Sequence, residues 1–394
     1  MDNGAGGPLG GGAVRPAYGD GSLADVMPSL LAALGVPGAG DRLGLAGRLA
    51  GVRRIAVLLV DGLGHRLLPL AAPVAPALAD VVAGRLGHLR VLTTGFPSTT
   101  PTSLTSLGTG APPGEHGLVG FTVNVPGTPR VLNHTEWTTD PDPRSWQPLT
   151  TQFARAAAAG VAVSMVARGE YEGSGLTESG WRGAGYRAAD DPDTLATQML
   201  AALIEPDPPV LVYGYHPDLD RLGHQFGVDS PAWRAAASGV DRLVTRLVEG
   251  LPGDAALVVT ADHGQLDVPA GCRFDLDTDL RLRAGVDVVA GEARVRYLHT
   301  APGAAGDVID TWRGVLGDAA WVASREEVVA AGWFGPVNEA HLARVGDVVV
   351  VCRDRYIVLA TAHEPERVAQ LVAFHGSWTA AEMLVPLIIV GGSG

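Results

Sequence analysis

The chain has 394 residues, of which 46% are hydrophobic and 18% charged, which is typical of a globular protein with a substantial core. Its formal net charge is −13 and its arginines form no basic stripe, which argues against a nucleic acid polymer as partner. All 29 basic residues are arginine, so Schiff-base chemistry, a pyridoxal phosphate anchor and a lysine-containing phosphate loop are excluded.

The amino terminus, residues 1–20, is rich in glycine and lacks a basic region followed by an apolar stretch, so we expect a flexible tail rather than a signal peptide. The longest apolar run, 67–79, is too short and too rich in proline to span a bilayer. Cys272 and Cys352 have no CxxC spacing and are too few for a disulfide framework. These features predict a soluble, cytoplasmic protein with no membrane partner and leave its oligomeric state open.

From residue 53 onward, short β-branched runs alternate with longer amphipathic segments. This pattern predicts the α/β class, with a mostly parallel central sheet flanked by helices on both faces. Several runs are apolar throughout, as strands buried on both faces should be. The predicted strands are 55–60, 89–93, 161–166, 210–215, 256–260 and 384–390. The predicted helices are 74–86, 101–109, 150–159, 192–204, 231–249 and 366–373.

Residues 271–364 differ from the rest of the chain in the pattern of their predicted strands and helices. We predict there strands at 294–299, 347–352 and 356–360 and helices at 304–316 and 324–332. Because a candidate site residue, His375, lies beyond this segment, we interpret 271–364 as an inserted, smaller α+β subdomain that resembles a lid. The catalytic α/β domain would then comprise residues 21–270 and 365–394.

Acidic and histidine residues follow several of the apolar runs, at the positions where an α/β sheet delivers side chains to its catalytic edge. Oxygen and nitrogen ligands in this number would suit a pair of divalent cations, three ligands to each. The residues are Asp61, Asp220, His224, Asp262, His263 and His375.

Each of these signals is weak or moderate alone. Asp61 suits a turn or a helix cap as well as a cation. Asp220 and His224 would share one face of a helix, whereas His216 and Asp218 lack a partner at that spacing. The adjacent pair in TADHG is the most specific, and His375 is weak by itself. Their occurrence in order, each at the end of an element, is what favours one site.

A dense run of serine and threonine, FPSTTPTSLTSLGTG, precedes an apolar helix at 101–109. Hydroxyl groups at a helix amino terminus lie beside amide donors that favour an anion. A hydroxyl on a cation ionises more easily than in water and becomes a nucleophile. The alternative is an ordinary helix cap rich in serine and threonine.

Together these motifs resemble the alkaline phosphatase superfamily, and within it the nucleotide pyrophosphatase/phosphodiesterase branch. The matching segments are VDGLG, FPSTTPTSLTSLGTG with PPGEHG, YHPDLDRLGH, TADHG and the late HG, which span residues 61–376. The resemblance implies two cations, zinc before manganese, and Thr100 as the nucleophile, with Thr99 and Thr102 as alternatives by a shift of register. It assigns one cation to Asp61, Thr100, Asp262 and His263, and the other to Asp220, His224 and His375.

The chain departs from this branch at one position. An asparagine that donates to the substrate phosphate in the branch corresponds here to Phe121, and Asn124 lies three residues further on. Either Asn124 moves in, or a backbone amide near Gly120 replaces it, or the substrate differs.

The resemblance implies a hydrolase that cleaves a phosphodiester or pyrophosphate bond in a small, nucleotide-like substrate through a phosphothreonine intermediate. The first alternative is a phosphomonoesterase or phosphomutase of the same superfamily, in which manganese replaces zinc and a serine often attacks. A phosphonate or sulfate ester is a more distant substrate. A metal-binding protein without turnover is the remaining alternative.

Overall fold

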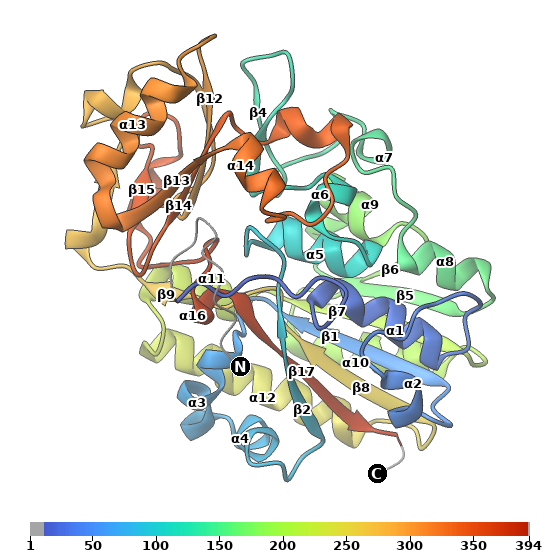
Figure 1. The fold of residues 1–394 in the computed structure, drawn as a ribbon. Helices are drawn as coiled ribbons and strands as arrows, with labels where there is room; N and C mark the ends of the chain where they lie inside the picture. Colours follow the sequence, from blue (N-terminus) through green and yellow to red (C-terminus); the bar gives the residue numbers. More distant parts are fainter. Residues whose placement is uncertain (1–11, 393–394) are drawn as a thin grey trace.

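The computed structural model describes residues 12–392 (Figure 1). Of the expected amino-terminal tail, residues 1–11 lie outside the described residues. The remainder is hydrogen bonded to the body of the protein: the amide of Val14 donates to the carbonyl of Trp378 at 2.8 Å, and the amide of Ala17 donates to Thr93 Oγ1 at 2.8 Å.

The central sheet has seven strands in the order β2-β17-β8-β1-β7-β5-β6. All neighbouring pairs from β8 to β6 are parallel, whereas β17 runs antiparallel to both of its neighbours. The predicted α/β class with a mostly parallel sheet is therefore confirmed. The strands are β1 (Arg54–Val60), β2 (His88–Thr93), β5 (Ala162–Ala167), β6 (Gly185–Ala188), β7 (Val210–His216), β8 (Ala255–Thr260) and β17 (Leu384–Gly391).

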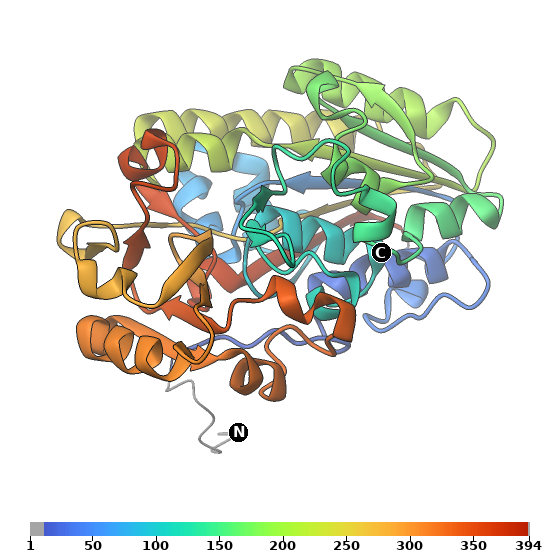
Figure 2. The same ribbon diagram turned by 90° about the horizontal axis from the view of Figure 1, so that it is seen from above.

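Helices cover both faces of this sheet (Figures 1 and 2). On β7, Tyr213 packs against Phe153 and Trp181 on one face, while its neighbour Gly214 faces Met199 on the other. The first layer contains α1 (Val26–Ala33), α5 (Thr100–Thr109), α8 (Gln152–Ala158) and α9 (Gly175–Trp181). The second contains α3 (Leu68–Ala71), α4 (Pro76–Val82), α10 (Pro192–Ile204) and α12 (Pro231–Glu249). The apolar runs of β1 and β8 are almost entirely buried because they lie between these layers.

A second, antiparallel sheet lies beside the first and has the strand order β11-β12-β14-β13 (Figure 1). Its strands are β11 (Val286–Glu292), β12 (Val295–Thr300), β13 (Ala320–Ser324) and β14 (Val348–Cys352), with α13 (Ala305–Leu316) and α14 (Arg325–Ala330) packed against them. The strand expected at 356–360 does not join this sheet. It appears as β15 (Ile357–Leu359), which pairs in parallel with β10 (Arg273–Asp275). The division at residues 271 and 364 stays a prediction.

Other elements differ from their predicted bounds in ways that packing explains. The helix expected at 366–373 is α15 (Glu366–Gln370), because the chain then extends into β16 (Ala373–Phe374), which pairs with β9 (Leu266–Asp267).

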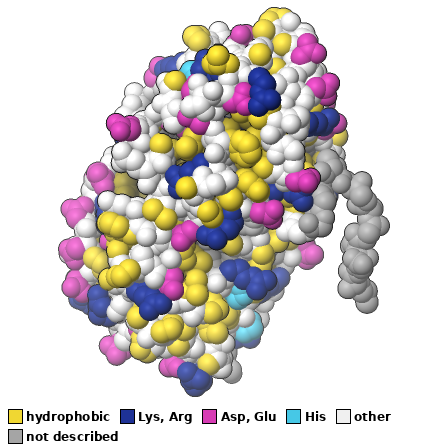
Figure 3. Space-filling view, turned by 90° about the vertical axis from the view of Figure 1, so that its left-hand side faces the viewer, with side chains coloured by type: hydrophobic (Ala, Val, Ile, Leu, Met, Phe, Trp, Pro, Cys, Tyr) yellow, Lys and Arg dark blue, Asp and Glu magenta, His cyan; other side chains and the backbone are white. Residues whose placement is uncertain are grey.

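Cys272 and Cys352 are both free thiols. In the described part of the chain, no helix is long and apolar enough to cross a membrane. On the face that Figure 3 shows, arginine side chains are interspersed with acidic and hydrophobic ones.

The register of the central strands brings several chain segments to one edge of the sheet. Val60 of β1 pairs with His216 of β7, and Leu59 pairs with Thr260 of β8, so these three strands end side by side. Since β17 is antiparallel, it begins at the edge where β2 ends, with Leu384 opposite Thr93. The segments that follow β1, β2, β7 and β8 and the segment that precedes β17 therefore meet there.

Candidate metal centre

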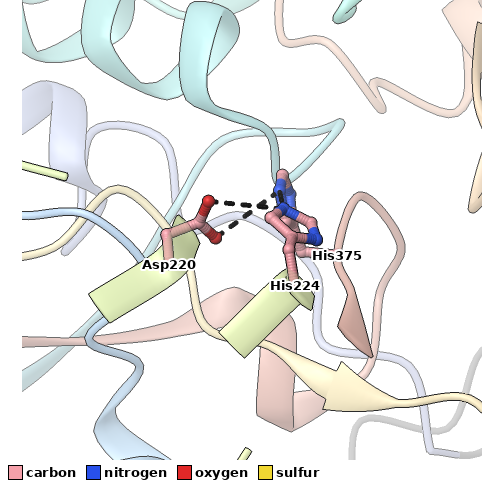
Figure 4. A group of neighbouring side chains, drawn as sticks. All are labelled: Asp220, His224 and His375. Carbon is pink, nitrogen blue, oxygen red and sulfur yellow. Dashed lines mark hydrogen bonds and ion pairs between the residues drawn. The ribbon is translucent and has the colours of Figure 1, made fainter. Parts of the chain in front are cut away.

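Asp220, His224 and His375 converge from two distant parts of the chain (Figure 4). Asp220 and His224 lie one turn apart on α11 (Asp218–Phe226), with Asp220 Oδ2 3.3 Å from His224 Nε2. His375 follows β16, and its Nε2 lies 3.1 Å from His224 Nε2 and 3.9 Å from Asp220 Oδ1. The helical spacing predicted for Asp220 and His224 is present.

The hydrogen bonds of the two imidazoles identify which ring nitrogens face each other. His224 Nδ1 lies 2.7 Å from the carbonyl of Ala373, and His375 Nδ1 lies 2.9 Å from the carbonyl of Ser98. A carbonyl oxygen only accepts, so in each ring Nδ1 carries the proton and Nε2 presents a lone pair. Two lone pairs opposed at 3.1 Å need a positive charge between them, which a proton or a divalent cation can supply, and the lowered pKa of His375 favours the cation.

Asp61, Asp262 and His263 form the adjoining group. Asp61 follows β1 directly, and the pair Asp262 and His263 follows β8. His263 Nε2 lies 3.5 Å from Asp61 Oδ1 and 3.3 Å from Asp262 Oδ2. His263 Nδ1 donates to the carbonyl of Gly264 at 3.2 Å, so its Nε2 also faces the carboxylates as an acceptor. Asp220 also belongs here, because ligand atoms of Asp61, Asp220 and His263 lie within 4.8 Å of one another.

The two groups are contiguous. The rings of His263 and His375 stack with centroids 3.5 Å apart and an angle of 13° between their planes. Asp220 is shared, since it lies within reach of both groups. The resemblance assigned Asp220 to one cation alone, whereas in the structure its carboxylate lies within reach of both groups and could contribute to either.

The electrostatics of the site are unfavourable for the side chains alone. Burial, together with the carboxylates of Asp262 and Asp220, raises the pKa of Asp61 well above its ordinary value. Burial likewise raises the pKa of Asp262. Burial, with His263 and His224 nearby, lowers the pKa of His375 well below its ordinary value. The buried oxygens Asp61 Oδ1 and Asp262 Oδ2 have no hydrogen-bond partner.

These observations fit divalent cations. Cations would neutralise the crowded carboxylates and complete the coordination of two buried oxygens that are otherwise unpartnered. The donor set of carboxylates and imidazoles is one that zinc accepts.

The Thr100 hydroxyl lies at the edge of this group. Thr100 is the first residue of α5, its side chain is partly exposed, and its Oγ1 lies 3.1 Å from His263 Nε2. The two residues kept open by a register shift, Thr99 and Thr102, are fully buried. Of the three threonines, Thr100 is thus the one that a substrate can reach.

Two further residues hold the carboxylates and were not identified from the sequence. Tyr215 donates its hydroxyl to Asp61 Oδ2, and Gln265 donates its amide to Asp220 Oδ1. Tyr215 is the first residue of the motif YHPDLDRLGH, and Gln265 directly follows TADHG. Their place in or beside these motifs was the signal, but nothing in the pattern showed that their side chains turn toward the site. Asp218, in contrast, pairs with Arg168 at 2.6 Å.

The side-chain amide of Asn124 is occupied by hydrogen bonds within its own hairpin. Its amide donates to the carbonyls of Thr128 at 2.8 Å and Arg130 at 3.1 Å, which closes the hairpin between β3 (Thr122–Asn124) and β4 (Val131–Asn133). The hypothesis that Asn124 replaces the branch asparagine is therefore not supported. Two explanations for the missing asparagine remain: a backbone amide near Gly120 replaces it, or the substrate differs.

Comparison with known proteins agrees with the geometry. Residues 55–378 match the family described as type I phosphodiesterase / nucleotide pyrophosphatase. The chain belongs to this family, within the alkaline phosphatase superfamily. An uncharacterized pyrophosphatase/phosphodiesterase of Schizosaccharomyces pombe is 27% identical over 216 residues. That match covers 52% of this chain and 43% of the yeast protein, less than half of its length.

Solved structures of the superfamily share the fold. Murine ectonucleotide pyrophosphatase/phosphodiesterase 5 is 20% identical, with a TM-score of 0.70 over 86% of this chain and 89% of that one. An inactive threonine-to-alanine variant of the murine protein, in complex with AMP, is 19% identical, with a TM-score of 0.69 over 86% and 88%. Phosphonoacetate hydrolase from Sinorhizobium meliloti 1021, in complex with phosphonoacetate, is 18% identical, with a TM-score of 0.65 over 87% and 90%. At these identities the likeness shows the fold.

Proposed function

We propose that this family member is a metal-dependent hydrolase that cleaves a phosphodiester or pyrophosphate bond of a nucleotide-like substrate through a covalent ester of Thr100. The position of the Thr100 hydroxyl carries the proposal: it is reachable, at the start of a helix, and 3.1 Å from His263 Nε2. The complex of a murine relative with AMP supports a nucleotide-like substrate.

Two divalent cations would be held by the two groups of side chains. Asp61, Thr100, Asp262 and His263 would hold one, and Asp220, His224 and His375 the other, with Asp220 in reach of both. Three imidazoles among the ligands favour zinc over manganese. When bound, the cations lower the pKa of the nucleophile hydroxyl and stabilise charge on the phosphoryl and leaving oxygens.

The chain itself contributes the nucleophile and its orientation. Thr100 Oγ1 gives up its proton and forms a bond to phosphorus while the bond from phosphorus to the leaving oxygen breaks, and the leaving oxygen takes up a proton. Water then cleaves the threonine ester, which restores the Thr100 hydroxyl and releases the phosphorylated product. Because Thr100 begins α5, backbone amides of the helix amino terminus would lie beside the phosphoryl oxygens of a bound substrate. His263 is oriented by its bond to the Gly264 carbonyl, which keeps Nε2 facing Thr100.

Replacement of Thr100 tests the covalent scheme. We expect Thr100→Ala to lower kcat by about 1,000-fold or more with cation content unchanged, because covalent catalysis is lost. Thr100→Ser keeps a hydroxyl and should retain part of the activity. The measurements are steady-state turnover and metal content, with a rapid quench to trap the phosphoryl adduct on the Thr100 peptide.

Thr99→Ala and Thr102→Ala are the matched controls on the same turn. Both should keep the adduct on Thr100. If Thr100→Ala turned over normally with both cations bound, the covalent scheme would be wrong. If Thr102→Ala alone abolished the adduct, the assignment of the nucleophile would shift to Thr102.

A phosphomonoesterase or phosphomutase is the second candidate, because the amide of Asn124 is occupied and Phe121 stands at the position of the branch asparagine. Rates on an aryl phosphodiester, an aryl phosphomonoester and phosphonoacetate separate the possibilities. We expect the diester to be preferred. A large preference for the monoester, or cleavage of phosphonoacetate alone, would overturn the substrate assignment while leaving the role of Thr100 intact.

A metal-binding protein without turnover predicts a different result. Purified protein that contains the cations and whose Tm falls on chelation, but that hydrolyses none of the three substrates, would support it over both enzymes.

A further inference from the structure

The hairpin between β11 and β12 rests on the turn that follows His375. Gly376 has φ +131, and a Cβ added there would lie 2.8 Å from Glu292 Cδ and 3.1 Å from Arg294 Cβ. The tip of the hairpin, residues 292–294, is thus packed directly against the backbone next to a candidate metal ligand. The second sheet therefore touches the metal centre through this hairpin.

Arg294, at the tip of the hairpin, forms a buried ion pair with Glu382 of α16 (Ala380–Met383). Arg294 Nε lies 2.8 Å from Glu382 Oε1, and Arg294 Nη2 lies 2.7 Å from Oε2. Both side chains are fully buried. A pair of this kind contributes little net stability, because desolvation offsets its attraction, so its position calls for a reason other than stability.

Glu382 holds both turns that carry histidines of the centre. Its carboxylate accepts hydrogen bonds from the amide of Ser377 at 2.9 Å and from Thr379 Oγ1 at 2.6 Å. Its backbone carbonyl accepts from the amide of Gly264, the residue after His263, at 2.9 Å. Glu382 of α16 thus forms hydrogen bonds to Gly264, which follows His263, and to Ser377 in the turn that follows His375.

From Ser377 the contacts continue to the imidazole of His375. Ser98 Oγ donates to the carbonyl of Ser377 at 2.7 Å, and the carbonyl of Ser98 accepts from His375 Nδ1 at 2.9 Å. The Ser98 amide donates to the carbonyl of Gly376 at 3.0 Å, which closes the connection. The orientation of the His375 ring therefore depends on the segment that Glu382 fixes.

We propose that Arg294 and Glu382 are positioning residues that couple the second sheet to the metal centre by holding the 375–382 segment. The inference rests on the proposed function only in that it requires a cation at Asp220, His224 and His375. It predicts that the affinity for this cation depends on the ion pair even when the fold is intact.

The chain offers a matched control on the neighbouring strand. Arg296 of β12 is almost fully buried and makes the same bidentate contact, with Glu364, at 2.5 and 2.8 Å. Arg296 Nε donates to the carbonyl of Val358 at 2.8 Å, so this pair ties β12 to the segment after β15 and not to the histidine turns.

The experiment compares Arg294→Met/Glu382→Leu with Arg296→Met/Glu364→Leu. Replacing both members of a buried pair by apolar residues avoids an uncompensated charge. The metal-free proteins are titrated with zinc by calorimetry, and their folding is followed by circular dichroism. We expect the first variant to bind one of two zinc ions about 10-fold or more weakly, since outer partners of ligands have effects of this size. The control pair should keep both affinities.

Equal zinc affinity in the folded first variant and in the wild type would overturn the inference. If the first variant fails to fold, two milder variants are compared instead. Arg294→Gln/Glu382→Gln keeps an acceptor for the Ser377 amide and should weaken zinc binding less than 10-fold. Arg294→Gln/Glu382→Met removes this acceptor, and full wild-type zinc affinity in that variant would overturn the inference. If the wild type itself binds no zinc, the proposed function fails, which is a distinct result.

Discussion

At the scale of single residues, the arrangement of lone pairs and protons distinguishes a cation site from a polar cluster. Every histidine of the centre donates its Nδ1 proton to a backbone carbonyl, of Ala373, Ser98 or Gly264. All three Nε2 atoms then face carboxylates or one another. This directionality is common among metal-binding histidines and is absent from a network satisfied by its own hydrogen bonds.

Tyr215 and Tyr213 provide a test at this scale. Tyr215 donates to Asp61 Oδ2, whereas the hydroxyl of Tyr213, two residues earlier on the same strand, is buried without a hydrogen-bond partner. Tyr215→Phe should lower cation affinity about 10-fold because Asp61 loses its orienting donor. Zinc titration of the metal-free protein measures it.

Tyr213→Phe is the control, since it removes a hydroxyl that makes no bond and should leave cation affinity unchanged. An equal loss of affinity in both variants would mean that the effect comes from packing on β7 rather than from the bond to Asp61.

At the scale of elements, α11 shows how a helix can carry ligands and also make room for their support. Gly223 lies between Asp220 and His224, and a Cβ there would lie 2.0 Å from Gln265 Oε1 and 3.3 Å from Trp233 Cδ1. Gln265 is the side chain that donates to Asp220. The helix therefore accepts a residue of low helix propensity at this position so that Gln265 can approach.

We expect Gly223→Ala to leave the fold intact but to displace the flexible end of Gln265 from Asp220. Cation affinity should fall about 10-fold, while thermal stability in chelator changes little because helix propensity offsets the crowding. Gly239→Ala on α12 is the control, since only the end of Arg242 comes within 4 Å of the added Cβ, at 3.8 Å. It should gain up to about 1 kcal/mol in the free energy of unfolding with cation affinity unchanged. Unchanged affinity in Gly223→Ala would contradict the role of Gln265.

Sequence patterns predicted the elements whose burial is uniform. The runs before Asp61 and Asp262 are almost entirely apolar and became β1 and β8, and the long amphipathic segments became α10 and α12 with the predicted bounds. The predictions omitted β6, β11 and β13, whose residues are partly exposed and form no uniform apolar run, although β11 forms a hairpin with β12, a strand that was predicted. The strand at 356–360 was found, but its pairing with β10 could not be read from its own residues.

At the scale of the whole molecule, the site is assembled from segments that are far apart in the chain. The sequence predicted which residues gather because parallel strands end at one edge, and the resemblance ordered them. It did not predict the shared position of Asp220 or the contact of Arg294 with Glu382, since these depend on how the second sheet packs on the first. Contacts between layers have no period in the sequence.

A buried histidine, His134, directly follows the hairpin of β3 and β4. His134 is fully buried: Nδ1 donates to the carbonyl of Gly120 at 2.9 Å, and Nε2 accepts from Trp146 Nε1 at 3.1 Å. Burial lowers the pKa of His134 from 6.5 to about 4. The unfolded chain therefore binds a proton that the folded protein rejects between these two values. The stabilising contribution is complete above pH 6.5 and is lost as the pH falls toward 4.

We expect this residue alone to lower the free energy of unfolding by about 2 kcal/mol between pH 7 and pH 5. His134→Gln keeps a donor and an acceptor but does not titrate. Between pH 7 and pH 5 the free energy of unfolding of this variant should therefore fall by about 2 kcal/mol less than that of the wild type, although the variant is less stable than the wild type at pH 7. Denaturant unfolding of the metal-free proteins at both values gives the difference. His88, exposed on β2, is the control, and His88→Gln should follow the wild type. If His134→Gln loses as much stability as the wild type between pH 7 and pH 5, the acid sensitivity of the fold arises elsewhere.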